Sequence, residues 1–180
     1  MLRKKGRFVT PLPLPAGDPI RELAANMLET MYDAQGVGLA AQQVGEALQL
    51  AVVDVMHDED CVSYLRINGE NCELADIMPL TFVNPLLEFG SAKGSQVEGC
   101  LSFGDLRAEV RRPLELTAKL QTLDGETLVI ETDGLLARAI QHETDHLFGV
   151  LFIDRMSSAR KMSLRRVLKE MQEDYLAGGG

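Results

Sequence analysis

Residues 141–149, QHETDHLFG, determine the interpretation of the whole chain. His142 and His146 are four residues apart, and Glu143 stands between them. On a helix, positions i and i+4 lie on the same face, so both imidazoles can reach one metal ion. A catalytic metal usually has three protein ligands and one open position for water. The stretch therefore predicts a metal site on a helix and leaves a third ligand to be found.

The residues around this motif predict that its helix is buried. The helix is expected to begin at Asp133-Gly134 and to stop at Gly149. Apolar residues leave it little polar surface: Leu135, Leu136, Ala139, Ile140 and Leu147. Buried imidazoles and a buried carboxylate need partners, which a metal ion supplies. The simpler alternative is a pair of surface histidines beside a solvated acid, and this apolar setting disfavours it.

Several residues are candidates for the third ligand. Zinc peptidases with this motif take it from a downstream histidine or acid, but no histidine follows His146 and the later acids lie on a helix expected to be exposed. His57 lies in an acidic loop, where a surface position is the better interpretation. Cys100 follows a glycine in a segment expected to be extended, yet a free cysteine is usually only a small buried hydrophobe. Cys61 and Cys72 lack even this context.

Length and composition exclude several classes of protein. The chain has 180 residues, 46% of them hydrophobic, which suits a single domain over 1–180 with a buried core. No apolar run reaches the ~20 residues of a membrane span, and the basic start lacks the apolar stretch of a secretory signal. A net charge of −9 argues against DNA binding, and three cysteines argue against a disulfide framework. We therefore expect a cytoplasmic protein that binds neither membrane nor DNA.

The order of the expected elements predicts an α+β fold. Asp18-Pro19 is typical of a helix start, and Gly36 is placed to end that helix. A final amphipathic helix is expected over 157–177, capped by Ser157 or Ser158. The strands are expected between these helices, in mixed or antiparallel sheets around the buried central helix that carries HETDH.

Four segments carry the strand and turn signals. Residues 48–55 and 80–85 are rich in β-branched or aromatic residues and predict strands. Residues 114–131 alternate around Asp124-Gly125, which is a strong hairpin signal. Residues 56–78 form an acidic excursion with an Asn68-Gly69 turn signal, so a hairpin is expected there as well.

Three stretches taken together closely resemble the signature motifs of the peptide deformylase family. They are GVGLAAQQ (36–43), EGCLS (98–102) and QHETDH (141–146), in the family's order and at its separation. The resemblance extends to LRKKGRFVT, ETMY and DGLLARAIQHETDHLFGVLFID, and it covers most of the chain. Residues 56–78 are atypical of the family.

The resemblance implies a metal centre made of Cys100, His142 and His146, so that Cys100 is the missing ligand. It implies one divalent ion per chain, with Fe(II) as the native ion and nickel, cobalt or zinc able to replace it. A thiolate with two imidazoles suits several late first-row ions, so ligand identity does not choose among them. Asp145 or a backbone carbonyl is expected to orient a ligand histidine.

The resemblance also implies the reaction, which is removal of the formyl group from the N-formylmethionine of nascent polypeptides, with release of formate. Glu143 is then the general base and acid, while Gln43 and the backbone N–H of Leu101 stabilise the oxyanion. The substrate is expected to bind as an added strand. The implied substrate-binding residues are Val37, Gly38, Gly99, Arg107, Leu135, Arg138 (through its aliphatic stem) and Ala139. Glu98 and Arg112 resemble a structural ion pair that supports the site.

The chain departs from the family at two places. The family usually has a proline two residues after the position of Ser102, where this chain has Gly104, preceded by Phe103. Because glycine is more mobile than proline, we expect a more mobile loop at the substrate entrance. Family members also usually begin earlier than this chain, with a strand. Either the sequence is truncated or this variant lacks the strand, and we expect an effect on stability more than on chemistry.

The last expected helix is rich in basic residues: Arg160, Lys161, Arg165, Arg166 and Lys169. In some bacterial deformylases a C-terminal helix docks on the ribosome, so the resemblance implies that this helix could contact the ribosome. The simpler alternative is a solvated charged face.

Two other functions stay open. A metallopeptidase would use the same helix motif without Cys100, and a degenerate deformylase would bind formyl-peptides or metal without turnover.

Overall fold

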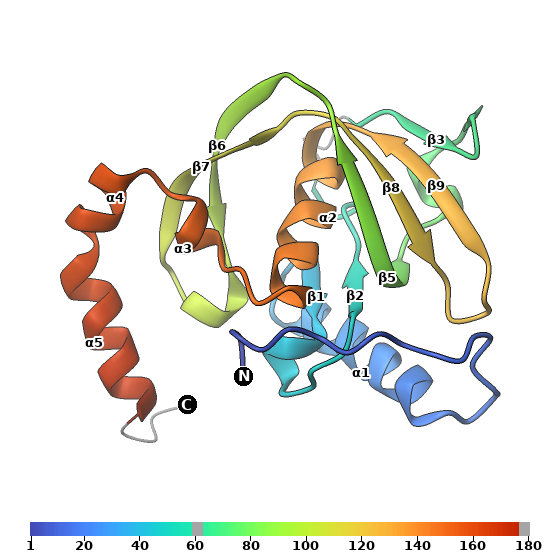
Figure 1. Cartoon of the computed structure of the whole chain (residues 1–180), viewed down its shortest axis with the longest axis horizontal. Coiled ribbons are helices and arrows are strands. Elements are labelled where there is room, and N and C mark those ends of the chain that lie inside the picture. The colour runs from blue at the N-terminus through green and yellow to red at the C-terminus, as the bar shows by residue number, and fades with distance from the viewer. Residues whose placement is uncertain (59–62, 177–180) are drawn as a thin grey trace.

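The structure is a computed structural model that describes residues 1–58 and 63–176, and it confirms the α+β class (Figure 1). Its main elements are α1 (Pro19–Asp33), β1 (Gly38–Ala40), β2 (Leu50–Val53), β3 (Leu65–Ile67), β4 (Glu70–Asn71), β5 (Leu80–Phe89), β6 (Lys93–Gly99), β7 (Arg107–Pro113), β8 (Leu116–Gln121), β9 (Thr127–Thr132), α2 (Gly134–Leu147), α3 (Phe152–Arg155), α4 (Ser158–Ser163) and α5 (Arg165–Leu176). Short 3-10 turns η1 (Ala41–Val44), η2 (Leu74–Asp76) and η3 (Leu101–Phe103) interrupt the connections.

Helix α1 begins where the sequence predicts. Asp18 Oδ1 accepts a hydrogen bond from Ile20 N at 2.8 Å, and Pro19 occupies the first turn, where its missing N–H has no cost. The helix ends as Gln35 adopts a φ of 53° and Gly36 N donates to Met31 O at 2.9 Å. The end of α1 therefore fixes the position at which the glycine-rich segment leading into β1 begins.

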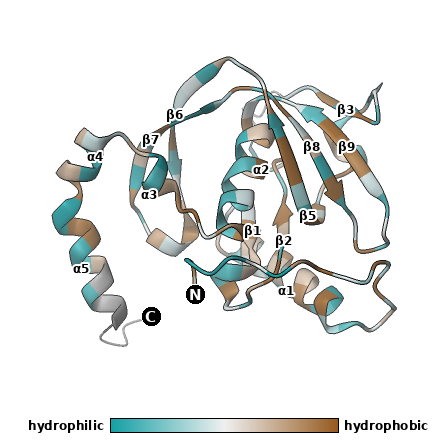
Figure 2. Cartoon of the chain, viewed as in Figure 1, coloured by the Kyte–Doolittle hydropathy of each residue, from teal (hydrophilic) through white to brown (hydrophobic). Residues whose placement is uncertain are grey.

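The seven-stranded sheet separates two hydrophobic cores. Its strand order is β1-β2-β5-β8-β9-β3-β4, and all of these neighbours pair antiparallel. Because side chains alternate along a strand, Ala51 and Val53 of β2 pack with α2, whereas Leu50 and Val52 pack with α1. Figure 2 shows the hydrophobic residues concentrated in β2, β5 and β8. Full burial of one such large apolar side chain contributes about 1.5–3 kcal/mol.

Helix α2 is the buried central helix that the sequence predicts. Leu136, Ile140 and Leu147 are fully buried in the core that the seven-stranded sheet forms with this helix. The opposite face of α2 meets the two-stranded β6–β7 sheet, to which Arg138 and His142 are joined through polar contacts (Figure 1). The HETDH motif thus lies between the two sheets.

The β6–β7 sheet and helix α3 form a smaller third core. Strand β6 pairs antiparallel with β7, so that Gly99 lies opposite Arg107 and Glu98 opposite Ala108. Cys100 follows β6 directly and is buried with Val110 of β7 and Phe152 of α3. This core carries the residue that the resemblance names as third ligand.

The C-terminal segment is helical, as predicted, and contains one break that was not expected. Ser157 caps α4 by accepting a hydrogen bond from Arg160 N at 3.2 Å, as expected, but the predicted single helix is divided at Leu164 into α4 and α5. Leu164 is half-buried against the core around Phe152. This packing accounts for the break, because a straight helix would not bring Leu164 to the core. In Figure 1 α5 extends along the outer side of the molecule, whereas α4 contacts the small sheet, where Arg160 Nη2 donates to Arg107 O at 3.3 Å. Residues 177–180 lie outside the described part of the chain.

Within the excursion, residues 65–71 form the predicted hairpin. Asn68 and Gly69 both adopt positive φ, 52° and 88°, between β3 and β4, and β3 pairs with β9. The excursion therefore extends the seven-stranded sheet. Residues 59–62, which include Cys61, lie outside the described residues. Every helix within the described ranges is too short or too polar to cross a membrane.

Candidate active site

Three potential metal donors meet at the junction of β6 and α2. Cys100 comes from the end of β6, and His142 and His146 come from successive turns of α2. One ligand atom from each lies within 4.8 Å of the others, and Cys100 Sγ is 3.3 Å from His146 Nε2. A thiol and two imidazoles are the donor set that borderline-soft ions such as zinc and iron take. The residues present therefore fit a divalent ion.

The electrostatics of the two histidines agree with such a centre. Burial, together with the neighbouring His142, lowers the pKa of His146 to about 3. Burial would also lower the pKa of His142, but hydrogen bonds with Cys100 and Glu98 outweigh it and raise that pKa to about 10. His146 Nδ1 is buried without a hydrogen-bond partner among the described residues. Binding of a cation to these donors would release a proton, because a metal binds deprotonated ligand atoms.

Glu98 orients His142, which corrects the expectation that Asp145 or a backbone carbonyl does so. His142 Nδ1 lies 3.1 Å from Glu98 Oε2. Burial would raise the pKa of Glu98, but hydrogen bonds from His142 and Arg112 lower it to about 2. An ionised carboxylate can only accept, so Nδ1 carries the proton and Nε2 is left to face the centre.

The predicted ion pair between Glu98 and Arg112 is present and belongs to a larger network. Arg112 Nε and Nη2 donate to the two carboxylate oxygens of Glu98, at 2.7 and 3.0 Å. Arg112 Nη1 donates to Asp145 Oδ2 at 2.7 Å, and Arg155 also contacts Asp145. Arg138, expected to offer only its stem, places its guanidinium against Glu98.

Glu143 lies at the edge of this centre, against β1. Its side chain is buried, and Oε2 has no hydrogen-bond partner within the described ranges. Burial raises the pKa of Glu143 to about 7, so the carboxyl can exchange a proton near neutral pH. A Cβ at Gly38 would overlap the carboxylate and lie 2.9 Å from Glu143 Cγ. Glycine at 38 is therefore required for this position of Glu143.

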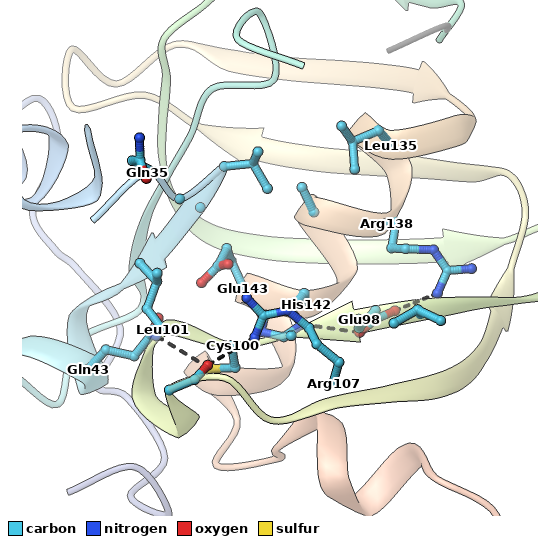
Figure 3. Close-up of a pocket in the computed structure, with 17 residues that line it drawn as sticks. Gln35, Gln43, Glu98, Cys100, Leu101, Arg107, Leu135, Arg138, His142 and Glu143 are labelled. Carbon is cyan, nitrogen blue, oxygen red and sulfur yellow. Dashed lines mark hydrogen bonds and ion pairs between the residues drawn. The ribbon is translucent and has the colours of Figure 1, made fainter. Parts of the chain in front are cut away.

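Gln43 and Leu101 bring the first two motifs together. Gln43 Oε1 accepts from Ala40 N at 2.8 Å, while Nε2 donates to Ser102 Oγ at 3.1 Å and lies 3.6 Å from Cys100 Sγ. Leu101 approaches the glycine-rich segment so closely that a Cβ at Gly36 would lie 2.8 Å from Leu101 Cδ1. Both residues consequently stand on the side of the centre away from Glu98 (Figure 3).

These elements enclose a cavity of about 260 Å³ (Figure 3). Every metal, catalytic and substrate-binding residue that the sequence predicted lines this cavity, except the buried His146. Sequence reasoning gave no role to Gln35 and Val97, whereas Gly104, expected in the loop at the substrate entrance, does line the cavity. Gln35 directly precedes the first motif, which could have indicated it, whereas the exposed Val97 gives no signal in the sequence.

The loop after Cys100 has a conformation that proline cannot adopt. Gly104 has a φ of 54°, and Leu106 N donates to Phe103 O at 3.1 Å, which closes a tight turn. Proline is restricted to a φ near −65°. Arg107 Nη1 donates to Gly104 O at 2.9 Å, and the guanidinium lies over Gly99. The departure from the family at Phe103-Gly104 thus corresponds to a distinct turn, and its mobility stays a prediction.

A cavity that ends at a site able to hold a divalent ion, with a proton-exchanging carboxyl beside it, defines a class of protein. It is the arrangement of a metal-dependent hydrolase that acts on an amide or ester.

Comparisons with known proteins identify the family within this class. A sequence profile described as polypeptide deformylase matches residues 1–162. The peptide deformylase of Methylacidiphilum infernorum is 42% identical over 172 residues, which cover 96% of this chain and 88% of that protein. A peptide deformylase structure from Plasmodium falciparum, 29% identical, covers 98% of this chain and 92% of its own with a TM-score of 0.79. Peptide deformylase 1B of Arabidopsis thaliana, in complex with an inhibitor, is 32% identical with a TM-score of 0.79, over 97% of this chain and 86% of its own.

The chain belongs to the polypeptide deformylase family. It is a hydrolase that removes the N-formyl group from nascent polypeptides, with the metal dependence typical of the family.

Proposed function

We propose that Cys100, His142 and His146 hold one divalent ion, and that Fe(II) is the native ion. The crowding of the three donor atoms supports the ligand set, and the resemblance to the family supports the choice of iron. When bound, such an ion polarises a carbonyl oxygen and makes water a stronger acid. Metal analysis of protein prepared without oxygen tests the choice, with about one iron per chain as the expected result.

Glu143 is the proton carrier in this proposal. Its carboxylate takes a proton from the water molecule whose oxygen forms a bond to the formyl carbon. The carbon–nitrogen bond then breaks, and the same proton passes to the leaving amine, so that formate and a free N-terminus result. The position of Glu143 in the cavity wall, against Gly38 and beside His142, supports this role.

Gln43 and the backbone N–H of Leu101 stabilise the negative charge that develops on the formyl oxygen. The support is the position of the Gln43 amide, whose Nε2 lies 3.6 Å from Cys100 Sγ. Loss of one such donor typically lowers kcat by about 10²–10³. Gln43→Ala is therefore expected to retain substrate binding better than turnover.

The substrate enters as an extended chain between two strand edges. β1 is the first strand in the order of the seven-stranded sheet, and β6 pairs only with β7 among the described residues. Val37, Gly38 and Gly99 offer their backbone groups to the peptide. The methionine side chain lies among five residues that line the cavity: Val37, Leu135, Ala139, His142 and the stem of Arg138.

The experiment that tests these roles is formate release from a short N-formylmethionyl peptide, with Fe(II)-loaded protein. We expect turnover in the native chain and a loss of about 10²–10⁴ in Glu143→Ala, at unchanged metal content. Turnover that survives in Glu143→Ala would exclude Glu143 as the proton carrier. Turnover that survives in Cys100→Ala would instead favour a metallopeptidase-like ligand set.

We also propose that residues 1–180 form one domain and that the protein is cytoplasmic.

A further proposal is that α4 and α5 contact ribosomal RNA. The support for the contact is the set of basic residues on exposed helices, although Arg166 and Lys169 face Glu170 and Glu173 at 3.2 and 3.3 Å. Removal of residues 158–180 is expected to reduce co-sedimentation with ribosomes. Unchanged co-sedimentation would leave only a solvated face.

A further inference from the structure

We propose that Arg155 is a positioning residue for the metal centre, which acts through Asp145, Arg112 and Glu98 on the orientation of His142. The inference rests on the proposed metal site. Arg155 lies on α3, beyond all three motifs that resemble the family.

The contacts form a continuous chain from α3 to the centre. Arg155 makes two bonds to Asp145, from Nη2 to Oδ1 at 2.6 Å and from Nε to Oδ2 at 3.1 Å. Asp145 Oδ2 also accepts from Arg112 Nη1 at 2.7 Å, and Arg112 in turn donates twice to Glu98. Glu98 accepts from the Nδ1 of His142. Four contacts therefore join an outer arginine to the imidazole of a proposed ligand.

Arg112 is shared between two carboxylates, and this makes Arg155 important. With Arg155 in place, Asp145 has a second cation, and Arg112 can give two of its N–H groups to Glu98. Without Arg155, Arg112 alone would neutralise Asp145. The attraction of Arg112 toward Asp145 would then compete with the two hydrogen bonds that Arg112 donates to Glu98. Glu98 would then hold His142 less firmly, and the Nε2 of His142 would face the centre less well.

The ion pairs of this network differ in burial. The pair of Arg112 with Glu98 is shielded from water, whereas the contact of Arg155 with Asp145 is partly open to it. The side chains of Arg112 and Glu98 are 3% and 5% exposed, and that of Asp145 is 11% exposed. The side chain of Arg155 is 48% exposed, so water can replace part of its contact when it is removed. Substitution of Arg155 should therefore disturb the position of His142 more than it disturbs the folding of the chain.

A second contact from α3 reaches the same histidine. The ring of Phe152, which is almost fully buried, stacks on His142 with centroids 6.1 Å apart and an angle of 29°. Phe152 also meets Phe103 edge-on at 5.3 Å. Helix α3 thus constrains His142 at the ring face through Phe152 and at Nδ1 through the network that Arg155 completes.

The test compares Arg155→Met with Arg66→Met. Arg66 is a matched control because it forms an ion pair with Glu131 at 3.2 Å, with its side chain 43% exposed, on a strand remote from the centre. The dissociation constant for Co(II) is measured by chelator competition, and the visible absorption of bound Co(II) reports its ligand geometry. We expect Arg155→Met to bind Co(II) about tenfold more weakly, with a changed spectrum, and Arg66→Met to match the native chain. Arg155→Lys, which keeps the charge but not the fork, should be intermediate.

Equal Co(II) affinity and spectrum in Arg155→Met and the native chain would overturn the inference. Equal weakening in Arg155→Met and Arg66→Met would also overturn it, because the effect would then be one of general stability. If Arg155→Met does not fold, Arg155→Lys replaces it under the same criteria. Undiminished Co(II) binding by Cys100→Ala would instead count against the proposed metal site and not against Arg155.

Discussion

The seven-stranded sheet and the β6–β7 sheet hold α2 from opposite sides with different chemistry. On one side, Phe82, Ile130 and Leu120 pack against the apolar face of the helix. On the other, Glu98 and Arg112 of the small sheet form ion pairs with polar residues of the same helix. Apolar packing has no preferred direction, whereas a two-pronged ion pair fixes the orientation of its partner. The comparison suggests that the large sheet supplies stability and the small sheet supplies position.

The largest effect is expected for Arg112→Met, in the small sheet. The change leaves Glu98 and Asp145 without their shared partner in the interior, which should lower the free energy of unfolding by about 3–5 kcal/mol. Metal affinity should fall as well, because Glu98 also holds His142. Denaturant unfolding and metal titration on the same preparation measure both. A loss of stability with native metal affinity would contradict the division of roles between the sheets.

A smaller effect on stability is expected for Gly38→Ala, at the edge of the large sheet. The added methyl group would displace Glu143, at a cost of about 1–3 kcal/mol in unfolding free energy and about 10² in kcat. The matched control is Gly90→Ala, where the nearest atom to the new Cβ is 3.3 Å away on Glu115. Equal kcat values for the two variants would show that the contact with Glu143 is unimportant.

Ile130→Val tests the large sheet alone. Ile130 is fully buried in the core beneath α2, and loss of one methylene there should cost about 0.5–1.5 kcal/mol of unfolding free energy. Steady-state kinetics should give the native kcat and KM, because the orientation of His142 and Glu143 depends on other contacts. A lowered kcat at full folding would mean that the apolar core also positions the site.

The smallest effect is expected for Arg166→Ala on α5. Arg166 pairs with Glu170 at 3.2 Å, but its side chain is 87% exposed, so solvent screens the pair. The free energy of unfolding should change by about 0.5 kcal/mol or less. Thermal unfolding compared with Arg112→Met would then show how far burial changes the value of the same kind of contact.

The sequence predicts the large sheet better than the small one, for a physical reason. Strand alternation, the Asp18 cap and the Asp124-Gly125 turn are local signals, and the structure confirms each of them. The polar network gives no local signal, because Glu98 and His142 are 44 residues apart in the chain and meet only in the fold. For the same reason the sequence offered Asp145 or a backbone carbonyl as the orienting group, and gave no role to Arg155. The break at Leu164 also depends on a tertiary contact.

The motifs indicate the residues of the candidate site more completely than they indicate the residues that hold these in position. Spacing alone indicated His142 and His146, and the resemblance to the family was needed for Cys100. The structure brings all three together, while their roles in metal binding and catalysis stay predictions. Val97 could not be foreseen, because an exposed valine at a strand edge has no distinguishing pattern.

The open edges of β1 and β6 also bear on how the chain avoids self-association. A free strand edge is a template on which another sheet can grow, and aggregation commonly starts there. Here residues 36–38 and 97–99 line the same cavity of about 260 Å³, whose wall includes Ala139 and His142 of α2. An extended peptide bound between them, as proposed above, would pair with both edges at once. Substrate binding would then cover the strand edges on which a second copy could otherwise grow.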